Sequence, residues 1–221
     1  VAGGLCPGCW SDMPFLEAPW CQRYGTPFTH DIGSDGIGPR AIANPPDFGR
    51  ARAAVLYSGP ARELVLRLKF SRRRELAPPM GQWMARAGAE LIEAESLIVP
   101  VPLHRLRLWQ RRFNQAADLA KAVAEVSGAE FVPDLLRRNR RTRQQVGLNA
   151  DARKRNVRGA FEVRPHHSAL VSGRHVVLVD DVFTTGSTVS ACTKILTSEG
   201  AARVDVLTFA NADPISALEQ T

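Results

Sequence analysis

The chain contains no long hydrophobic run, and no stretch of its 221 residues approaches the roughly 18 apolar residues needed to cross a bilayer. Its start, VAGGLCPGCW, lacks the charged and then apolar pattern of a secretory signal. Hydrophobic residues make up 44% and charged residues 23%, an ordinary balance that excludes a disordered or collagen-like chain. We therefore expect a cytoplasmic globular protein with no membrane insertion.

Positive charge is distributed unevenly along the chain. The formal net charge is +7, and residues 137–158 hold eight Arg and one Lys against one Asp, a local charge of +8. The remaining residues therefore sum to −1. A localised basic segment is typical of a surface that contacts phosphate or nucleic acid, although a solvated basic loop would show the same pattern.

Composition divides the chain into a short N-terminal module and a larger domain. Residues 1–38 contain three of the four cysteines and end in a glycine-rich stretch that indicates a linker. In residues 48–96 the apolar side chains recur at helical spacing. We expect a cysteine-rich module over 1–38 and an α/β domain over 48–221.

Short apolar runs alternate with amphipathic segments from Leu97 onward. This alternation is the mark of a parallel sheet with crossover helices. The expected strands are 97–102, 175–181 and 204–210, and the expected helices are 113–128 and 187–200. No internal repeat and no low-complexity tract accompanies them.

The most informative segment is VVLVDDVFTTGSTV, at residues 176–189. A buried strand ends in Asp180 and Asp181, at the edge where open α/β sheets bind ligands. A turn of small hydroxyl residues around Gly186 then opens a helix, and such a turn can bind a phosphate group through backbone N–H groups and hydroxyls. Carboxylates beside a phosphate more plausibly accept hydrogen bonds from sugar hydroxyls, directly or through a metal ion. The combination predicts a site for a ribose 5-phosphate.

This span resembles the phosphoribosyl-pyrophosphate (PRPP) binding motif of type I phosphoribosyltransferases. The resemblance implies a type I phosphoribosyltransferase-like α/β fold and binding of PRPP with Mg2+. It also implies that Asp180 and Asp181 are the catalytic-site acids that contact the ribose hydroxyls. By the same resemblance the 5-phosphate is bound by the loop residues Thr184, Thr185, Gly186, Ser187 and Thr188.

Two further motifs narrow the resemblance. VPVPLHRLRLWQRRFNQAADLA at 99–120 and RTRQQVGLNADARKRNVRGAFEV at 141–163, with the cysteine-rich start, are similar to the ComF family of phosphoribosyltransferase-like competence proteins. The similarity spans nearly the whole chain. One departure is Arg112, where the family's R-G-F-N-Q motif has Gly, and it adds charge beside the expected ligand cleft.

The family resemblance assigns roles to other polar residues. It places the pyrophosphate contacts in the V-P-V-P-L-H turn, with His104, Arg105 and Arg111 as candidates, although His104 would also be an ordinary surface turn residue. Cationic donors there suit a pyrophosphate opposite the ribose site. Four residues match family positions in a basic loop that would close over substrate or dock DNA: Gln145, Arg153, Asn156 and Phe161.

The N-terminal cysteines indicate a zinc-ribbon-like module. Cys6 and Cys9 form a C-x2-C knuckle, the usual first half of a thiolate zinc site. Cys21 follows, but a second knuckle would need Cys at position 24, where this chain has Tyr24. We expect Cys6, Cys9 and Cys21 as Zn2+ ligands with the fourth ligand missing.

Several outcomes remain open for that fourth position. His30 or Asp31 substitutes for the missing thiol, water or a second chain completes the site, or zinc is not held and the thiols stay free. Cys192 lies on the apolar face of an expected helix and is predicted to be a core residue.

Two functions from different classes follow. The first is Mg–PRPP or ribose 5-phosphate binding in a competence protein, acting as a phosphoribosyltransferase if active, with no acceptor identified. The alternative is a non-catalytic competence factor that binds single-stranded DNA beside a helicase, with contacts at Arg138, Arg140 and Arg141. Base stacking is the weaker part of that alternative, because only 7% of residues are aromatic. Phe113, Trp109 and Phe161 are the aromatic residues near basic clusters.

Overall fold

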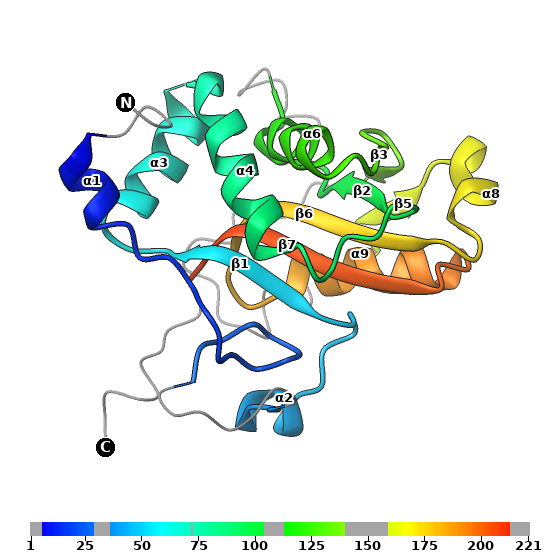
Figure 1. Cartoon of the computed structure of the whole chain (residues 1–221). Helices are drawn as coiled ribbons and strands as arrows, with labels where there is room; N and C mark the ends of the chain where they lie inside the picture. The colour runs from blue at the N-terminus through cyan, green and yellow to red at the C-terminus, as the bar shows by residue number, and fades with distance from the viewer. Residues whose placement is uncertain (1–5, 29–35, 72, 104–112, 140–158, 213–221) are drawn as a thin grey trace.

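A computed structural model describes residues 6–28, 36–71, 73–103, 113–139 and 159–212. Its centre is a five-stranded parallel sheet in the order β1-β7-β6-β2-β3 (Figure 1). The strands are β1 (Ala51–Leu56), β2 (Leu97–Pro100), β3 (Glu130–Phe131), β6 (His175–Phe183) and β7 (Arg203–Asn211). A separate antiparallel pair joins β4 (Leu136–Arg138) and β5 (Phe161–Val163). The parallel α/β fold expected from the sequence is confirmed.

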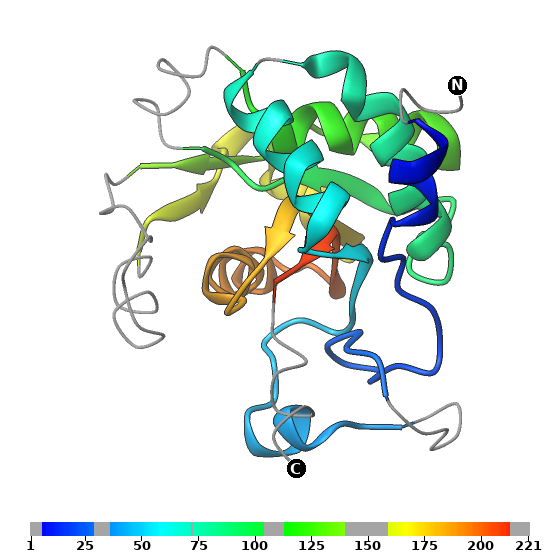
Figure 2. The same ribbon diagram turned by 90° about the vertical axis from the view of Figure 1, so that its left-hand side faces the viewer.

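Helices cover both faces of the parallel sheet. One face carries α3 (Gly59–Phe70), α4 (Ala77–Ala87) and α6 (Gln115–Ser127), and the opposite face carries α9 (Ser187–Ser198), seen end-on in Figure 2. Shorter helical turns are α1 (Pro7–Ser11), α2 (Pro39–Ala43), η2 (Arg74–Leu76), η3 (Pro165–His167) and α8 (Ser168–Val171). No described helix has the length and apolar character to span a bilayer.

The expected elements after Leu97 are present, with shifted ends. The first strand stops at Pro100, and the second continues two residues past the predicted 181, to Phe183. The helix expected over 113–128 begins after Asn114, whose side chain caps it by accepting from the Ala116 N–H. Gly128 ends that helix in the left-handed conformation (φ 75°), as its position predicts.

Strand β1 was not expected, because residues 48–96 show only helical patterns. Its sequence, ARAAVL, contains one β-branched residue and places an arginine in the interior. The side chain of Arg52 is nevertheless buried, and its guanidinium donates to Glu90 Oε1, to Gln22 Oε1 (2.9 Å) and to the Gln22 carbonyl (3.1 Å). Tertiary partners on both sides of the strand thus override its local propensity.

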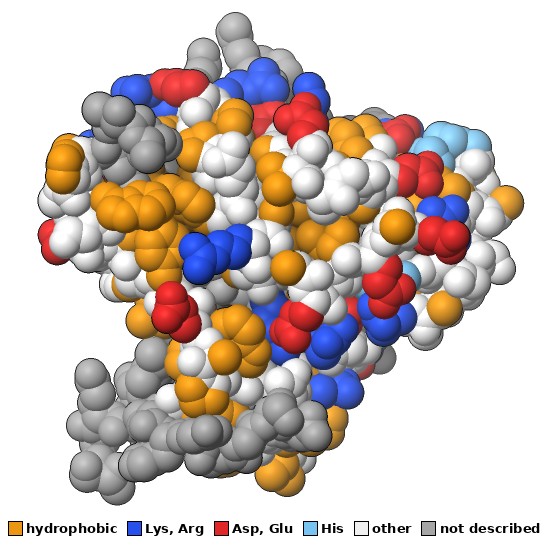
Figure 3. All heavy atoms as spheres, in the orientation of Figure 1, with side chains coloured by type: hydrophobic (Ala, Val, Ile, Leu, Met, Phe, Trp, Pro, Cys, Tyr) orange, Lys and Arg blue, Asp and Glu red, His pale blue; other side chains and the backbone are white. Residues whose placement is uncertain are grey.

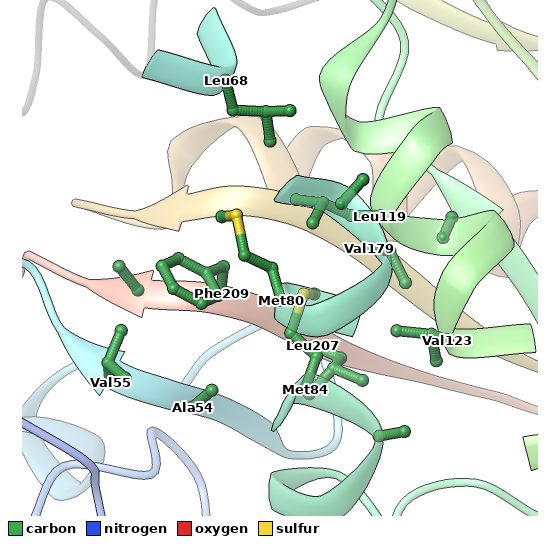
Figure 4. Close-up of a cluster of buried hydrophobic side chains, with 14 of the residues drawn as sticks. Ala54, Val55, Leu68, Met80, Met84, Leu119, Val123, Val179, Leu207 and Phe209 are labelled. Atoms are coloured by element: carbon green, nitrogen blue, oxygen red, sulfur yellow. The ribbon is translucent and has the colours of Figure 1, made fainter. Parts of the chain in front are cut away.

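Apolar side chains form a core on each face of the sheet. Between the sheet and α3, α4 and α6, the core includes Met80, Met84, Leu207 and Phe209, which Figure 4 shows facing one another. The core on the α9 face includes Cys192, which is fully buried as predicted. Burial raises the pKa of the Cys192 thiol, so it stays a protonated core group.

The N-terminal segment runs along the free edge of β1 (Figure 1). Phe15 forms an antiparallel bridge with Val55, and the Leu16 N–H donates to the Ala54 carbonyl at 3.0 Å. Further on, the Ala51 N–H donates to the Arg23 carbonyl at 2.8 Å. A bare edge strand exposes unpaired backbone groups, and here the N-terminal segment covers them.

An aromatic cluster packs α1 against α4. The rings of Trp10, Phe15 and Trp83 lie edge to face with centroids 5.5 Å apart. Figure 3 shows hydrophobic side chains gathered on this face of the molecule, and Trp10 and Phe15 remain partly exposed. The segment therefore attaches to the larger domain through backbone pairing, the Arg52 hydrogen bonds and aromatic contacts. The predicted boundary between residues 38 and 48 stays a prediction.

Candidate functional site

A cleft of about 310 Å³ lies at the carboxyl ends of β1, β2 and β6. Its lining includes Val101, Pro102 and Leu103 after β2, the acidic end of β6, and the turn that leads into α9. Parallel α/β sheets bind ligands at this edge. The structure therefore brings the predicted acidic pair and the predicted phosphate loop into one cleft.

The two aspartates have different surroundings. Asp181 is buried, and its Oδ1 forms an ion pair with Lys69 Nζ at 3.0 Å. Its Oδ2 accepts a hydrogen bond from Gln115 Nε2 at 2.8 Å. Asp180 Oδ1 accepts from the Asp181 backbone N–H at 2.8 Å. Asp181 is thus held by neighbouring side chains, whereas the side-chain hydrogen bond of Asp180 is to the adjacent backbone.

Proton affinity distinguishes the same pair. Burial and the neighbouring negative charge of Asp181 raise the pKa of Asp180 to about 7, against the opposing effects of its backbone hydrogen bond, Lys69 and Arg138. A carboxyl poised near neutral pH in a cleft is typical of functional sites. A ligand that brings Mg2+ or a hydroxyl donor to Asp180 would favour its charged form.

The turn between β6 and α9 depends on a glycine and on a hydrogen bond between two hydroxyls. Gly186 adopts φ 79°, and a Cβ there would lie 2.9 Å from Cζ of Phe183, so both conformation and space require glycine. The Thr185 and Ser187 hydroxyls are hydrogen-bonded to each other at 2.8 Å. Thr184, Gly186, Ser187 and Thr188 line the cleft, while Thr185 lies beside them and braces Ser187.

Three residues of the cleft were not identified from the sequence as site residues. Lys69 comes from the end of α3, Gln115 from the first turn of α6, and Arg138 from β4. Gln115 belongs to the quoted F-N-Q motif, which is the signal that pointed toward it. No local pattern marks Lys69, and the basic segment that contains Arg138 indicated DNA contact and gave no sign of the cleft, because each residue reaches the cleft from an element distant in the chain.

Part of the predicted site lies outside the described residues. This holds for the pyrophosphate candidates His104, Arg105 and Arg111, for Arg112, and for the loop residues Gln145, Arg153 and Asn156. The assignment of Phe161 to a basic loop is corrected by the structure, in which Phe161 is buried in β5. The Arg138 guanidinium carbon lies 5.1 Å from the centroid of its ring.

The basic segment 137–158 is described only at its start. Arg138 is buried in the cleft, and Arg137 is ion-paired with Glu162 across the β4–β5 ribbon. The expectation that Arg138 contacts DNA stays a prediction, and the structure places its side chain in the cleft. Phe113 is also buried and offers no open stacking surface, like Phe161.

The cysteines predicted to bind zinc do not converge in the described structure. Cys6 and Cys9 stand at α1, where the Cys9 N–H donates to Cys6 Sγ at 3.4 Å, and this bond lowers the pKa of the Cys6 thiol. Cys21 is buried elsewhere and accepts from the Gly38 N–H at 3.3 Å. Within the described ranges, the three thiols do not form a group close enough for one ion. The donor set therefore does not fit a ready zinc site, and His30 and Asp31 lie outside those ranges.

One group of three metal-type ligands does occur among the described residues, at Asp134, His166 and His167. His167 Nε2 lies 3.0 Å from Asp134 Oδ1, and His166 Nε2 lies 3.7 Å from Oδ2. Arg164 Nε approaches the same carboxylate at 3.8 Å. The His167 hydrogen bond and these charges lower the pKa of Asp134. We interpret the group as a surface ion-pair cluster, because a cation already faces the carboxylate.

Comparisons with known proteins agree with this organisation. Residues 116–220 match the model of the phosphoribosyl transferase domain, and residues 1–39 match the model of the double zinc ribbon domain. The second match points to zinc binding by the N-terminal module, although Cys21 lies apart from Cys6 and Cys9 among the described residues.

Curated relatives align over nearly the whole chain. DNA utilization protein YhgH of Escherichia coli strain K12 is 35% identical over 209 residues, which cover 92% of this chain and 88% of that protein. Competence protein F of Haemophilus influenzae is 27% identical over 214 residues, covering 95% and 91%.

Solved structures with similar folds include the allosteric regulatory enzyme of purine biosynthesis (23% identity, TM-score 0.44, covering 67% of this chain and 30% of that one). Another is glutamine PRPP amidotransferase from B. subtilis (22% identity, TM-score 0.40, covering 59% and 25%). At these identities and TM-scores the matches carry no argument about this chain.

Proposed function

This chain belongs to the ComF family of phosphoribosyltransferase-like competence proteins, and from that premise we propose that its cleft binds PRPP or a ribose 5-phosphate together with Mg2+. Membership supports a role in competence or DNA utilisation, as the names of the relatives indicate. The observation that carries the proposal is the junction of β6 and α9, which sets a carboxylate pair and a glycine-dependent hydroxyl loop on the walls of one cleft.

The two aspartates have different roles in binding the ribose. Asp181 is held by Lys69 and Gln115, so it fixes the floor of the cleft and the end of β6. Asp180 lines the cleft beside it, and its carboxylate accepts hydrogen bonds from the ribose hydroxyls. Because Asp180 has a pKa of about 7 without ligand, binding at pH 6 would require loss of a proton and would be weaker than at pH 8.

The phosphate end of the ligand faces the loop before α9. Ser187 and Thr188 supply hydroxyl donors, and the N-terminus of a twelve-residue helix supplies backbone N–H groups and a favourable dipole. Gly186 lets the ligand approach the backbone, since no side chain stands between.

Mg2+ fits the donor set of this cleft. The ion prefers oxygen ligands and is commonly held by one or two carboxylates together with substrate phosphates. Asp180 is the carboxylate available for that purpose, and bound Mg2+ would neutralise charge on the pyrophosphate of PRPP. Lys69 and Arg138 contribute the described positive charges on the walls.

Phosphoribosyl transfer at this site would expel pyrophosphate from C1 of the ribose and join C1 to an acceptor nucleophile. The cleft offers groups that position and stabilise charge, which is the protein's main part in such chemistry. The acceptor stays unassigned, so our proposal concerns binding, and transfer stays a prediction.

The test is calorimetric titration of the purified protein with PRPP and Mg2+, and separately with ribose 5-phosphate. Saturable binding is expected for the wild type. In the double variant Asp180→Asn/Asp181→Asn, affinity should fall by at least about 100-fold, since charged hydrogen bonds of roughly 1.5–3 kcal/mol each are lost.

The matched control is Asp47→Asn, which removes a surface aspartate paired with Lys194, away from the cleft. It should bind like the wild type. Equal affinity of the double variant and the wild type would reject the ribose assignment, and absence of binding to the folded wild type would reject the proposed function.

Single-stranded DNA binding beside a helicase is the second candidate, and the local +8 charge of residues 137–158 favours it. Because Arg138 faces the cleft, the variant to test is Arg140→Glu/Arg141→Glu. We expect it to weaken DNA binding and to reduce the salt dependence of that binding, because fewer phosphates are neutralised. Unchanged affinity for DNA would remove these two arginines from the interface.

A further inference from the structure

Tyr24 occupies the position where a second C-x2-C knuckle would need its last cysteine, and it has other partners in the structure. Its ring packs edge to face on Phe48, with centroids 5.8 Å apart, and on Phe183 at 6.2 Å. Phe48 and Phe183 also contact each other at 6.0 Å, perpendicular. The three rings form a closed triangle between the N-terminal segment and the end of β6.

One corner of this triangle touches the phosphate loop. Phe183 is the last residue of β6, immediately before Thr184, and its ring lies against Gly186. A Cβ at position 186 would meet Phe183 Cζ at 2.9 Å and Cε2 at 3.4 Å. The position of the Phe183 ring therefore sets the space in which the loop turns.

The opposite corner is tied to the segment around α2. The Tyr24 hydroxyl donates to the Asn44 carbonyl at 2.9 Å. The Arg40 guanidinium lies 4.1 Å from the centroid of the Tyr24 ring and 6.0 Å from that of Phe183. A cation over an aromatic ring is attractive, so Arg40 and Asn44 hold the tyrosine to the segment around α2.

We propose that Tyr24 is a positioning residue for the phosphate loop: it holds the Phe183 ring against Gly186 and so couples the N-terminal module to binding of the 5-phosphate. This role rests on the proposed function of the cleft. At the position where a fourth metal ligand is missing, this chain has a tyrosine whose ring contacts Phe183, and the N-terminal module thereby supports the loop.

Two variants separate the ring from the hydroxyl. Tyr24→Leu removes both aromatic contacts and the cation–π contact, whereas Tyr24→Phe keeps the rings and loses the bond to Asn44. Aromatic pairs contribute roughly 0.5–1.5 kcal/mol beyond burial, so Tyr24→Leu should weaken ribose 5-phosphate binding about 3- to 10-fold. Tyr24→Phe should stay within about 2-fold of the wild type.

The matched control is Trp10→Leu, which removes an aromatic ring of the same module. Among the described residues Trp10 packs its ring on Phe15 and Trp83, whereas Tyr24, Phe48 and Phe183 pack on one another. It should lower the melting temperature about as much as Tyr24→Leu and leave ribose 5-phosphate affinity unchanged. Equal losses of affinity in both variants would show a general structural effect and overturn the proposal.

A second measurement tests the proposal without a ligand. Hydrogen exchange of backbone amides in peptides that cover residues 184–190 should be faster in Tyr24→Leu than in the wild type and in Trp10→Leu. If the wild type binds no ribose 5-phosphate but the exchange difference is present, the proposed function fails and the support of the loop by Tyr24 stands. If exchange in the loop is the same in all three proteins, the role of Tyr24 fails.

Discussion

The β6–α9 junction and the N-terminal segment differ in how far along the chain their partners lie. At the junction, the strand, the acidic pair, the loop and the helix are contiguous over residues 175–198. The N-terminal segment is instead held by residues far away in sequence, such as Val55, Trp83 and Arg52. The first region is therefore specified locally and the second by tertiary contacts.

The cysteines also show that the N-terminal segment is specified by tertiary contacts more than by its local sequence. Their spacing indicates a metal-bound module, and Cys6 and Cys9 do lie together, but Cys21 is buried elsewhere and the segment is held by hydrogen bonds and rings. Substitutions that remove long-range contacts should therefore damage the N-terminal segment most. Substitutions at the junction should act mainly on the ligand site.

The largest effect on stability is expected for Arg52→Ala. The guanidinium is buried and links β1 to Gln22 and to Glu90, so its loss removes these charge-assisted hydrogen bonds and leaves a gap where the buried side chain packed. We expect the free energy of unfolding to fall by about 3 kcal/mol, measured by urea denaturation. The fluorescence of the N-terminal tryptophans should change at lower urea than the far-UV signal of the sheet.

The control is Arg67→Ala, which removes an exposed arginine paired with Glu63 one helical turn away. Such pairs contribute about 0.5 kcal/mol or less. A similar loss in both variants would mean that the hydrogen bonds of Arg52 do not anchor the segment, and the contrast between the two regions would fail.

A smaller effect is expected from pH, through Asp180. Its folded-state pKa of about 7 lies above the unfolded value of 3.8, so the native state binds more protons between these values. Its contribution to stability is therefore greatest below pH 4 and falls as pH rises toward 7. Asp180→Asn should remove that fall and stabilise the ligand-free protein at pH 8 by about 2 kcal/mol, less than the full shift implies because the carboxyl is partly exposed.

Urea denaturation of wild type and Asp180→Asn at pH 5 and pH 8 checks this expectation. The difference between the two proteins isolates Asp180 from the other titrating groups. Asp47→Asn should keep the wild-type pH dependence, since that aspartate lies at the surface with Lys194. A parallel pH dependence in wild type and Asp180→Asn would contradict the raised pKa.

Much of the fold is predictable because crossover units carry their own signals. The strand and helix around Asp180 are marked by apolar periodicity and by a glycine with positive φ, and the helix before Gly128 is marked by its cap. Strand β1 has no such signal, because its stability comes from the burial of Arg52 against partners in two other segments.

The site divides in the same way. Asp180, Asp181 and the loop residues can be found from one contiguous motif. Lys69 and Arg138 cannot, because they enter the cleft from α3 and β4, and only the packing of those elements brings them to the acidic pair. The proposed support of the loop by Tyr24 is not predictable from the sequence around it either, because the spacing of the cysteines indicates only a missing metal ligand.

The smallest expected difference compares Gly186→Ala with Gly173→Ala. Both glycines have positive φ, 79° and 72°, so alanine costs roughly 1 kcal/mol at either position. A Cβ at 173 meets no atom within 4 Å, whereas a Cβ at 186 would press on the Phe183 ring at 2.9 Å. Gly186→Ala should therefore be less stable than Gly173→Ala by about 1 kcal/mol in urea denaturation, and it alone should weaken ribose 5-phosphate binding. Equal stability and equal binding of the two variants would show that the Phe183 ring does not constrain the conformation of the loop. The aromatic rings behind the β6–α9 junction would then have no role in ligand binding.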